Sequence, residues 1–490
     1  MAALSASDRV GREDVVMFIN ATIASTAQRE FRSSADGQRM SLEFLHEYVL
    51  GNYRELYAAS LALDINHLNA GMIATNLLRT AADADASQRA IEGRLIAARL
   101  RRLPPQRVYG VFGQLRRLGI NNRRTRAIVR DWVAARPDPA LDAVKYRRAL
   151  SVAARHAHLS LAGEVGTALF DWRRARRYRT PILEAWRRAH YERRALYELP
   201  YTVAEGLAAR HGIDRARFLT GIAPRLTGGE RLRLQSSARR LDVNSVVMDL
   251  ASAPLTRLAL YVLSLPRSER ANRREELTAA LQASARRTAS RQAGTWGRVV
   301  AVLDDSYSSS GSRVKRRRPL AVALAAHYLL DALATIYTGL WLNHGGDPLL
   351  VHPIGATALG DRILDGLEHR PDRLVVVSDG WDNAPPGLAA EVLRVWRTRL
   401  DPHERTSVVH LNPVYDSDTF DVRRLSPDVA TVGVRDAEDA AALVELARFA
   451  TGSAGFDDLR RHLTDRVDGF LTTSDRGAPA EPDDTTEEAT

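Results

Sequence analysis

The sequence predicts a multidomain protein, with an N-terminal all-α helical-repeat module followed by a C-terminal α/β domain of the doubly wound type. Through about residue 295, apolar residues recur at three- and four-residue steps, as amphipathic helices require, and strand-like alternation is almost absent. After Trp296, short apolar runs rich in β-branched residues alternate with helical segments. That alternation is typical of a mostly parallel sheet whose strands are buried on both faces.

The helical-repeat module is expected over residues 31–295, after an N-terminal extension of residues 1–30. Its predicted helices are Ser41–Val49, Leu61–Thr80, Ser87–Leu103, Val108–Leu118, Arg124–Ala135, Leu141–Ala157, Ile182–Leu199, Val203–Arg210, Gly229–Leu241, Leu255–Ser264 and Arg273–Ser290. Proline and glycine separate them, for example at Pro104, Pro137, Gly212 and Pro266. Many short helices in series favour an α-solenoid, although the sequence has no clean repeat of fixed length.

The α/β domain is expected over residues 297–470. Its predicted strands are Arg298–Leu303, Thr335–Leu342, Leu374–Val377, Ser407–Leu411 and Val429–Val434. The predicted helices between and after them are Leu320–Leu333, Thr357–Leu367, Leu388–Leu400 and Ala437–Ala450. Residues 471–490 are acidic, contain proline and lack apolar anchors, so we expect a disordered tail there.

The composition narrows the class of protein. The chain has 490 residues and no cysteine, which excludes disulfides, thiolate metal sites and cysteine nucleophiles and fits a reducing cytosol. The N-terminus lacks the basic and apolar regions of a signal peptide. No apolar stretch reaches the roughly 18 residues of a membrane span. We therefore expect a soluble cytoplasmic protein.

Charge is distributed unevenly along the chain. Residues 1–300 contain 50 basic and 28 acidic residues, whereas residues 301–490 contain 20 basic and 31 acidic residues. Nearly all the basic residues are arginine; the lysines are Lys145 and Lys315. GC-rich coding could account for the preference for arginine, but not for its concentration in one half. We expect that half to bind a polyanion.

A possible cation site follows the first strand of the α/β domain. Asp304, Ser306 and Ser308 lie on the polar loop after this strand, Thr357 precedes a later helix, and Ser378-Asp379-Gly380 ends another buried strand. Taken alone, the first three residues favour an ordinary turn, because Asp and Ser are common turn residues. With Thr357 and Asp379 in register, two carboxylates and three hydroxyls favour Mg²⁺ with retained waters and one open position.

These residues resemble the metal-ion-dependent adhesion site of the von Willebrand factor A family, over about residues 297–470. The resemblance implies that Ser306, Ser308 and Thr357 contact the metal, and that Asp304 and Asp379 bind it directly or through water. It also implies that a partner's carboxylate takes the sixth position. The sequence departs from the family at Tyr307 and in the insertion Ser309–Arg318. The five basic residues of that insertion could repel a cation or attract an anionic partner.

The densest basic segment covers residues 171–194, where nine arginines are interleaved with aromatic residues. Arginine forks bind phosphates and aromatic faces stack on unpaired bases, a combination suited to single-stranded or looped RNA. In the alternative interpretation, each cluster is the solvated face of a helix and Trp172 and Trp186 anchor the core. We expect the two tryptophans to be core residues and the arginines together to bind RNA.

The combination of a helical half with a von Willebrand A half resembles the Ro ribonucleoprotein (TROVE) family. The segments that carry this resemblance are Ala143–Arg147, in a stretch with His156 and His158, and Pro254–Tyr261. It implies a HEAT-like ring that binds small structured noncoding RNAs of the Y type and loose ends of defective RNA, sometimes with an exonuclease as partner. It also implies that the protein is not an enzyme. By position, the expected RNA-binding residues are Lys145, Arg147, His156, Arg173, Arg174, Arg176 and Arg177.

Two other functions stay open. A protein-interaction scaffold would use the metal site to hold an acidic partner and the basic helices to bind protein or a membrane surface. A metal-dependent nuclease or phosphatase is less favoured, because no paired acid and base accompany the metal ligands and His327, His344 and His352 are scattered.

Overall fold

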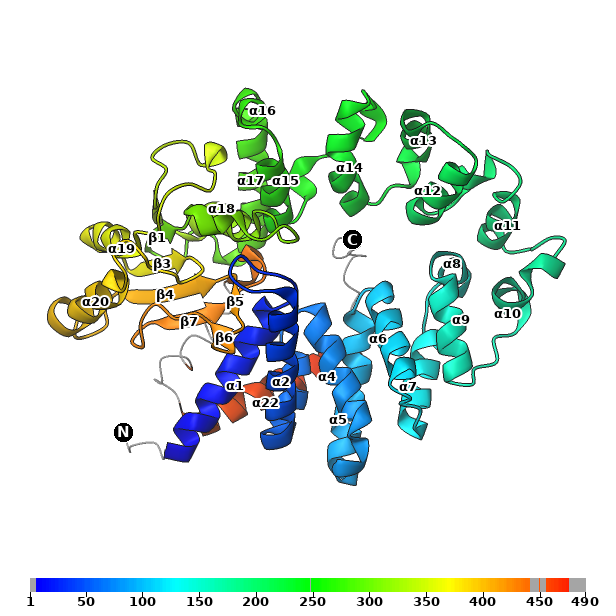
Figure 1. Ribbon diagram of the computed structural model, residues 1–490, viewed down its shortest axis with the longest axis horizontal. Coiled ribbons are helices and arrows are strands. Elements are labelled where there is room, and N and C mark those ends of the chain that lie inside the picture. Colours follow the sequence, from blue (N-terminus) through cyan, green and yellow to red (C-terminus); the bar gives the residue numbers. More distant parts are fainter. Residues whose placement is uncertain (1–5, 247, 441–448, 450–454, 476–490) are drawn as a thin grey trace. The chain divides into compact units, whose positions relative to one another are not determined.

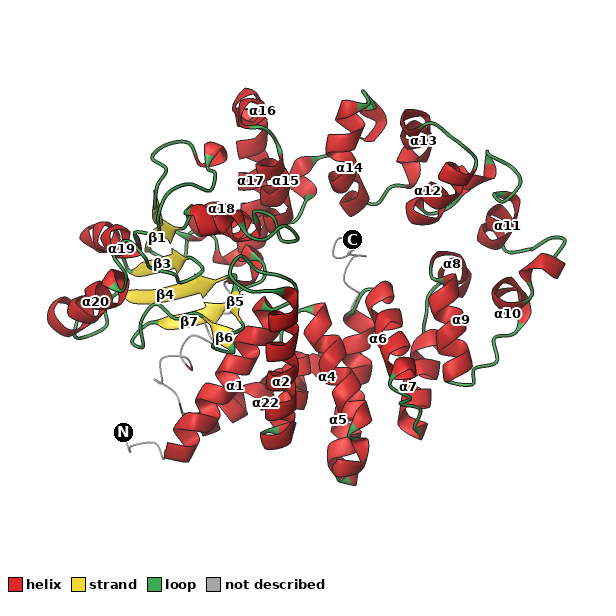
Figure 2. Ribbon diagram, viewed as in Figure 1, coloured by secondary structure: helices red, strands yellow, loops and turns green. Residues whose placement is uncertain are grey.

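The computed structural model describes residues 6–246, 248–440, 449 and 455–475 of the chain (Figures 1 and 2). The chain forms two compact units: unit 1 comprises Met1–Asn69 and Asp249–Arg466, and unit 2 comprises Ala70–Met248 and Val467–Thr490. Residues 70–248 are thus inserted between two segments of unit 1. Within the described residues, no helix is both long and apolar enough to cross a membrane.

Unit 1 contains a parallel five-stranded sheet in the order β2-β1-β3-β4-β7. Its strands are β1 (Arg298–Leu303), β2 (Ile336–Trp341), β3 (Arg373–Val377), β4 (Ser407–Asn412) and β7 (Ala430–Gly433). From β1 the chain crosses to β2 on one side and then returns to β3 on the other side of β1. This change of direction is the topological switch point of a doubly wound sheet, beside which ligands bind at the carboxyl ends of the strands.

Helices cover both faces of this sheet. On one face α19 (Leu359–Glu368) and α20 (Leu388–Val395) complete a core that includes Val300 and Val376. On the other face lies α18 (Arg318–Leu333), which contacts β1, β2 and β3. Most side chains of α18 are buried because α15 (Leu255–Ser264) and α17 (Arg274–Ala289) pack against it from behind. A helix that is apolar on nearly every side suits this central position.

The N-terminal helices α1 (Ala6–Ala24), α2 (Ala35–Asn52) and α3 (Arg54–Ala59) also belong to unit 1. Helix α1 contacts β7 and the two-stranded antiparallel sheet of β5 (Tyr415–Asp416) and β6 (Asp421–Val422). The buried Asn20 donates to Asp421 Oδ1 over 3.1 Å and accepts from the Gly433 N–H over 3.0 Å. Residues 1–30, expected only as an extension, therefore include a helix that packs on the α/β domain.

His46 is a buried polar contact in this N-terminal segment. Its Nδ1 lies 2.8 Å from the Tyr57 hydroxyl and its Nε2 lies 3.1 Å from Asn69 Oδ1, and its ring packs edge-on against Phe18. Burial lowers the pKa of His46 to about 4. The folded state therefore holds the neutral imidazole, whereas the unfolded chain binds a proton below the usual pKa of about 6.5.

We expect the protein to lose stability as the pH falls from 6.5 towards 4, because protonation of His46 favours the unfolded state over that interval. By linkage this group contributes a loss of about 3 kcal/mol at pH 4. Chemical unfolding of His46→Gln across this range should show a shallower pH dependence than the native chain. The exposed His403→Gln is the control; identical profiles for the native chain and His46→Gln would contradict the assignment.

Unit 2 consists of short helices in series. Its α-helices after residue 80 and before residue 248 are α5 (Ala86–Arg102), α6 (Pro105–Arg117), α7 (Arg123–Ala134), α8 (Pro139–Lys145), α9 (Arg147–His156), α10 (Gly163–Phe170), α11 (Pro181–Arg188), α12 (Tyr201–Arg210), α13 (Arg215–Ile222) and α14 (Gly228–Arg240). Helices near one another in sequence pack together, for example α6 with α9 and α8 with α11. Asp, Asn and Thr side chains cap several N-termini, including Asn122 before α7 and Thr227 before α14.

Aromatic residues and one buried ion pair form the core of the α6–α8 region. The Trp132 ring lies edge-on to Tyr109 and Phe112, and its Nε1 donates to the Leu100 carbonyl over 3.1 Å. Asp142, which is 1 % exposed, accepts from Arg136 Nε over 2.6 Å and from the Tyr109 hydroxyl over 3.0 Å. Arg136 Nη2 donates to the other carboxylate oxygen over 3.1 Å, so both oxygens of this buried carboxylate have a donor, as such burial requires.

Several predicted helices end earlier than their apolar pattern suggests. The segment 141–157 divides at Tyr146 into α8 and α9. The segment 61–80 divides before α4 (His67–Arg79), because Asn66 Oδ1 accepts from the Asn69 N–H and starts a new helix. The segment 182–199 ends as a helix at Arg188, where the His190 ring bonds the carbonyl of Trp186. At the second and third of these boundaries a polar side chain bonds the backbone, a contact that hydrophobic periodicity does not reveal.

One other prediction changes at the C-terminal end. Helix α22 (Phe456–Asp475) runs past residue 470, so residues 471–475 are helical and do not belong to the predicted tail. Residues 476–490 lie outside the described part of the chain. The predicted helix 437–450 begins with a 3₁₀ turn, Ala437–Asp439, and residues 440 and 449 are helical; its other residues lie outside the described part of the chain.

Candidate metal site and basic helical surface

The polar residues predicted to bind metal lie at the switch point of the sheet. Asp304 directly follows β1, and Asp379 stands two residues after β3, the strand beside it. Gly380 turns the chain away from the site at φ 78°, and a Cβ there would lie 2.7 Å from the Arg423 carbonyl oxygen. Only glycine fits this close, left-handed turn.

Four of the five predicted ligands form one hydrogen-bonded cluster. Asp304 Oδ1 accepts from the Ser306 N–H over 2.8 Å, and its Oδ2 accepts from the Ser378 hydroxyl over 2.7 Å. The hydroxyls of Ser306 and Ser308 are 3.2 Å apart, and the Ser308 hydroxyl lies near enough to the Asp379 carboxylate to lower its pKa. All of these side chains are nearly inaccessible to solvent.

Thr357, the fifth predicted ligand, is buried on a loop that is bonded to both strand-end loops. Its N–H donates to Asn383 Oδ1 over 3.0 Å, and its carbonyl accepts from the Asn383 N–H over 3.1 Å. Two residues earlier, the Gly355 carbonyl accepts from the Tyr307 N–H over 3.1 Å. The backbone thus holds Thr357 between the loops that carry Asp304 and Asp379.

The two carboxylates of the cluster lie in an unfavourable electrostatic environment. Burial raises the pKa of Asp304, and burial together with the charge of Asp304 raises the pKa of Asp379 to about 6. Arg32, on the loop between α1 and α2, acts in the opposite direction on the pKa of Asp379. Two buried carboxylates so close together favour a bound cation, because a cation stabilises both charged forms.

The donor set and the space beside it fit a hard divalent cation. A cavity of about 10 Å³, enough for one water or ion, is lined by Asp304, Ser309, Ser378 and Asp379 among others. The Ser309 hydroxyl is buried and has no hydrogen-bond partner within the described residues. The described residues contain no group of three or more His, Asp or Glu side chains that could hold a metal. Metal binding here would therefore depend on hydroxyls beside two carboxylates, a set that suits Mg²⁺.

No protein-family model matches the sequence, and no curated protein matches it significantly.

The basic insertion beside the metal loop is largely engaged inside unit 1. The Lys315 ammonium pairs with the buried Glu30, and Arg318 Nη2 lies 2.9 Å from Asp436 Oδ1. Arg317 donates to the Leu263 carbonyl. Arg313 and Arg316 are exposed. Three of the five basic residues thus stabilise the fold, which accounts for a basic segment so close to a candidate cation site.

Sequence reasoning missed three residues at this site: Arg32, Ser309 and Trp381. Ser309 directly follows Ser308, and Trp381 directly follows Ser378-Asp379-Gly380, so both could have been found by extending these two segments by one residue. Arg32 gave no signal, because it lies more than 270 residues before Asp304 in the chain. Only the docking of α1 and α2 on the α/β domain brings it to the site.

The predicted RNA-binding residues have different environments. Arg173, Arg174, Arg176 and Arg177 are exposed on the 3₁₀ turn Trp172–Arg174 and the loop after it, and none of them forms an ion pair within the described residues. Arg147 instead donates to the carbonyls of Ala168 and Leu169 over 3.2 and 3.1 Å. His156 Nε2 bonds the Ile120 carbonyl over 2.9 Å, and Lys145 is half-buried beside the Tyr146 ring.

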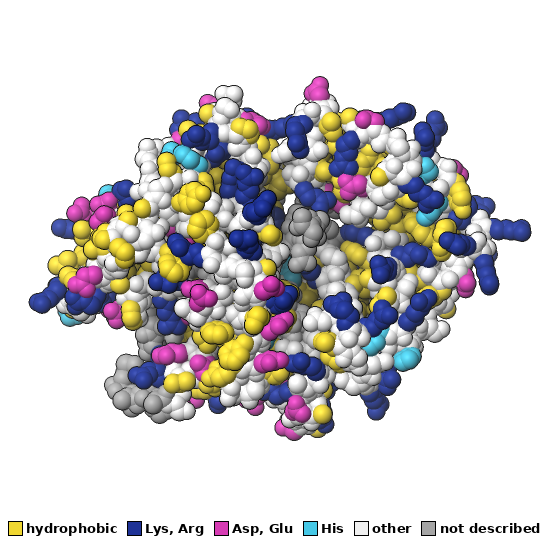
Figure 3. Space-filling model, viewed as in Figure 1, with side chains coloured by type: hydrophobic (Ala, Val, Ile, Leu, Met, Phe, Trp, Pro, Cys, Tyr) yellow, Lys and Arg dark blue, Asp and Glu magenta, His cyan; other side chains and the backbone are white. Residues whose placement is uncertain are grey.

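An aromatic group lies beside these four arginines. The Trp172 ring is 5.3 Å from Trp186 and 5.0 Å from His190, and the Arg147 guanidinium lies over both tryptophans. Trp186 is buried, as expected of a core residue, but Trp172 is half-buried and Tyr191 is 73 % exposed. Figure 3 shows Lys and Arg side chains gathered over the part of unit 2 that contains α7 to α13, with few acidic side chains among them.

Proposed function

We propose that the protein is a non-catalytic RNA-binding protein whose unit 2 holds the RNA. The supporting observation is the match between charge and fold. Residues 70–248 contain 35 basic and 15 acidic residues, whereas the two segments of unit 1 contain 34 basic and 37 acidic residues. The basic excess is thus confined to one folded unit. Such an excess costs self-repulsion unless a polyanion relieves it.

Arrangement as well as charge favours RNA as this polyanion. The surface of Arg173, Arg174, Arg176 and Arg177, with Trp172 and Tyr191 beside it, is called here the arginine–aromatic surface. Guanidinium groups free of carboxylates can bind phosphates, while exposed ring faces can stack on unpaired bases. The resemblance to the Ro family, with its Y-type RNAs and loose RNA ends, agrees with this reading.

The salt dependence of binding tests this function. We expect the full-length protein to bind a fluorescently labelled single-stranded RNA, with an affinity that falls steeply and linearly on a log–log plot as salt increases. Fluorescence anisotropy at several NaCl concentrations measures the slope. An RNA with a stem and a 3′ tail serves as the second ligand. Affinity that is absent at low salt for both RNAs would contradict RNA binding.

A second proposed function, which can coexist with the first, is metal-dependent docking of a protein partner at the Asp304–Asp379 cluster. It is favoured by the convergence of two carboxylates and several hydroxyls at the switch point of the sheet.

Metal-dependent hydrolysis is the least favoured alternative. His410, which contacts the site, is fully buried, and its two ring nitrogens bond the Ser378 carbonyl and the Thr431 hydroxyl. It is therefore not placed to act as a general base.

A further inference from the structure

A cavity of about 180 Å³ opens beside the candidate metal site, within unit 1. Ser308 and Asp379 of the metal cluster form part of its wall, and Arg32 of the α1–α2 loop forms another part. Asp416 and Asp418, from the β5 region, also line it. The volume is comparable to the roughly 150 Å³ that accommodates a benzene-sized molecule, so a protein side chain fits inside.

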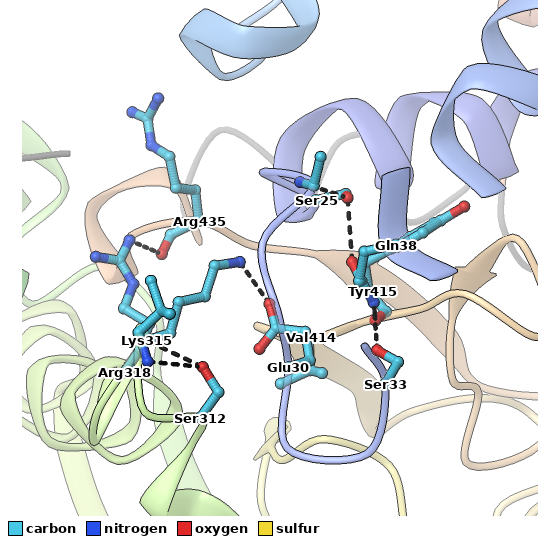
Figure 4. A network of polar contacts seen from close by, with 12 residues as sticks. Ser25, Glu30, Ser33, Gln38, Ser312, Lys315, Arg318, Val414, Tyr415 and Arg435 are labelled. Carbon is cyan, nitrogen blue, oxygen red and sulfur yellow. Dashed lines mark hydrogen bonds and ion pairs between the residues drawn. The ribbon is translucent and has the colours of Figure 1, made fainter. Parts of the chain in front are cut away.

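The loop that carries Arg32 is anchored on both sides of this residue (Figure 4). Two residues before it, the buried Glu30 forms an ion pair with Lys315 of the metal loop. One residue after it, the Ser33 hydroxyl accepts from Gln38 Nε2 over 2.7 Å, and the same amide donates to the Tyr415 carbonyl over 2.9 Å. Arg32 is therefore presented by a fixed segment rather than by a free loop.

The Arg32 guanidinium is held at the mouth of the metal cluster by an aromatic ring. The guanidinium lies 4.2 Å from the centre of the Trp381 ring, and the backbone N–H of Trp381 donates to Asp379 Oδ1 over 3.0 Å. Arg32 is exposed to solvent. A guanidinium stacked on a ring keeps its N–H donors available in its own plane, where they can bind an incoming oxyanion.

Two acidic side chains, Asp416 and Asp418, also line the cavity. Asp416 accepts only the Asp418 N–H, over 3.0 Å, among the hydrogen bonds of the described residues, and neither carboxylate forms an ion pair there. The cavity wall thus combines a cationic group, Arg32 beside the candidate metal, with two carboxylates outside the metal cluster. Two free carboxylates at its edge disfavour the multiply charged backbone of RNA and favour a ligand that carries both charges.

We propose that this cavity recognises an acidic side chain of a protein partner that is followed directly by a basic residue. The Arg32 guanidinium and the metal would share the carboxylate, and Asp416 and Asp418 would bind the adjoining cation. This inference rests on the metal-dependent docking proposed above. Arg32, on the loop between the N-terminal helices, would then determine specificity, and the partner would need an acidic residue followed by a basic one.

The test uses the full-length protein and a blocked, fluorescein-labelled Gly/Ser peptide with one central Glu-Lys pair. In saturating Mg²⁺, we expect Arg32→Gln to weaken peptide binding about tenfold, because a charge-assisted bidentate contact is lost. Arg29→Gln, an exposed arginine of the same loop that does not line the cavity, is the matched control and should bind like the native chain. Arg32→Lys should give an intermediate affinity. Asp416→Asn with Asp418→Asn should remove the preference for Glu-Lys over Glu-Gln peptides.

Metal binding is measured separately by calorimetry with Mg²⁺ alone, and we expect Arg32→Gln to bind it at least as well as the native chain. If the native chain binds no Mg²⁺, the docking function itself is wrong. If Mg²⁺ binds but Arg32→Gln and Arg29→Gln bind the peptide equally, only the recognition pocket is wrong. Displacement of the peptide by a short 5′-phosphorylated RNA, stronger than by unlabelled peptide, would also overturn it.

Discussion

Replacing Arg173, Arg174, Arg176 and Arg177 together by glutamine is expected to lower the affinity for single-stranded RNA by about 200-fold near 150 mM salt. Each phosphate contact to a single strand contributes about 0.7 to the slope of log affinity against log salt. Four lost contacts therefore reduce the slope by about 3. Between 1 M salt, the reference point of the log–log plot, and 150 mM salt, a slope smaller by that amount corresponds to a loss of affinity of about 200-fold. Anisotropy titrations over a range of salt concentrations measure both quantities.

The size of this effect follows from how the four arginines are placed. They are exposed, they lie within five consecutive residues, and they form no ion pair in the described part of the chain. Their printed contacts are peripheral: Arg173 lies over the Trp172 ring, and the charge of Arg177 lowers the pKa of Glu184. Arg147 is different, because its guanidinium bonds two backbone carbonyls of α10. Its replacement would disturb packing as well as binding and would be harder to interpret.

A control variant separates local contacts from net charge. It replaces four exposed arginines of unit 1 by glutamine: Arg29, Arg370, Arg399 and Arg405. The formal charge changes by the same amount, but we expect little effect on affinity and slope. Equal losses in the two variants would show that RNA responds to overall charge only and would remove the arginine–aromatic surface as the binding site.

The second large effect is expected at the metal cluster, where Asp304→Asn should abolish Mg²⁺ binding and yet raise the melting temperature of the metal-free protein. The negative charge of the Asp304 carboxylate attracts the cation. Its loss should therefore lower the affinity for Mg²⁺ by at least about two orders of magnitude, by analogy with perturbed metal sites. Without metal, the same carboxylate is buried beside Asp379, and removing one of two neighbouring buried charges relieves repulsion and desolvation.

Calorimetry with Mg²⁺ and thermal unfolding with and without Mg²⁺ check these two opposite signs. The native chain should gain stability with Mg²⁺ because only the folded state has the site. Asp401→Asn is the control, since Asp401 is a buried carboxylate of the same unit that accepts from the Arg405 and Thr406 N–H groups over 2.8 and 2.9 Å. The Asp401→Asn substitution should lower stability and leave Mg²⁺ binding unchanged. A metal-dependent gain in Asp304→Asn equal to that of the native chain would refute the site.

The strands and the strand-end residues could be predicted because their signals are local. A run such as Val299–Leu303 is apolar at every position, which marks a strand buried on both faces, and the polar residues that follow it must lie at the edge of the sheet. Parallel order then brings Asp304 and Asp379 to the same edge. A helical part followed by an α/β part, and the placement of Asp304 and Asp379 at one edge of the sheet, therefore follow from local patterns and parallel strand order.

The remaining features depend on contacts that a local pattern does not contain. The docking of α1 depends on Asn20, whose partners Asp421 and Gly433 lie some 400 residues later in the chain. Arg32 reaches the metal cluster only through that docking. Arg147 and His156 looked like binding residues in sequence, whereas the structure engages both with backbone carbonyls. Charge in a sequence does not tell whether a cation serves the fold or a ligand.

The sequence separation between Asn20 and its partners also determines the order in which parts of the protein can fold during synthesis. At synthesis rates of roughly 10 residues per second, α1 leaves the ribosome about 40 seconds before the strand it packs against exists. The inserted helices of residues 70–248 have their partners nearby and can fold during that time. Unit 1, in contrast, closes only when its second segment has been made. Until then the nascent chain exposes the apolar face of α1, so we expect it to need a chaperone more than a chain of similar length with local contacts would.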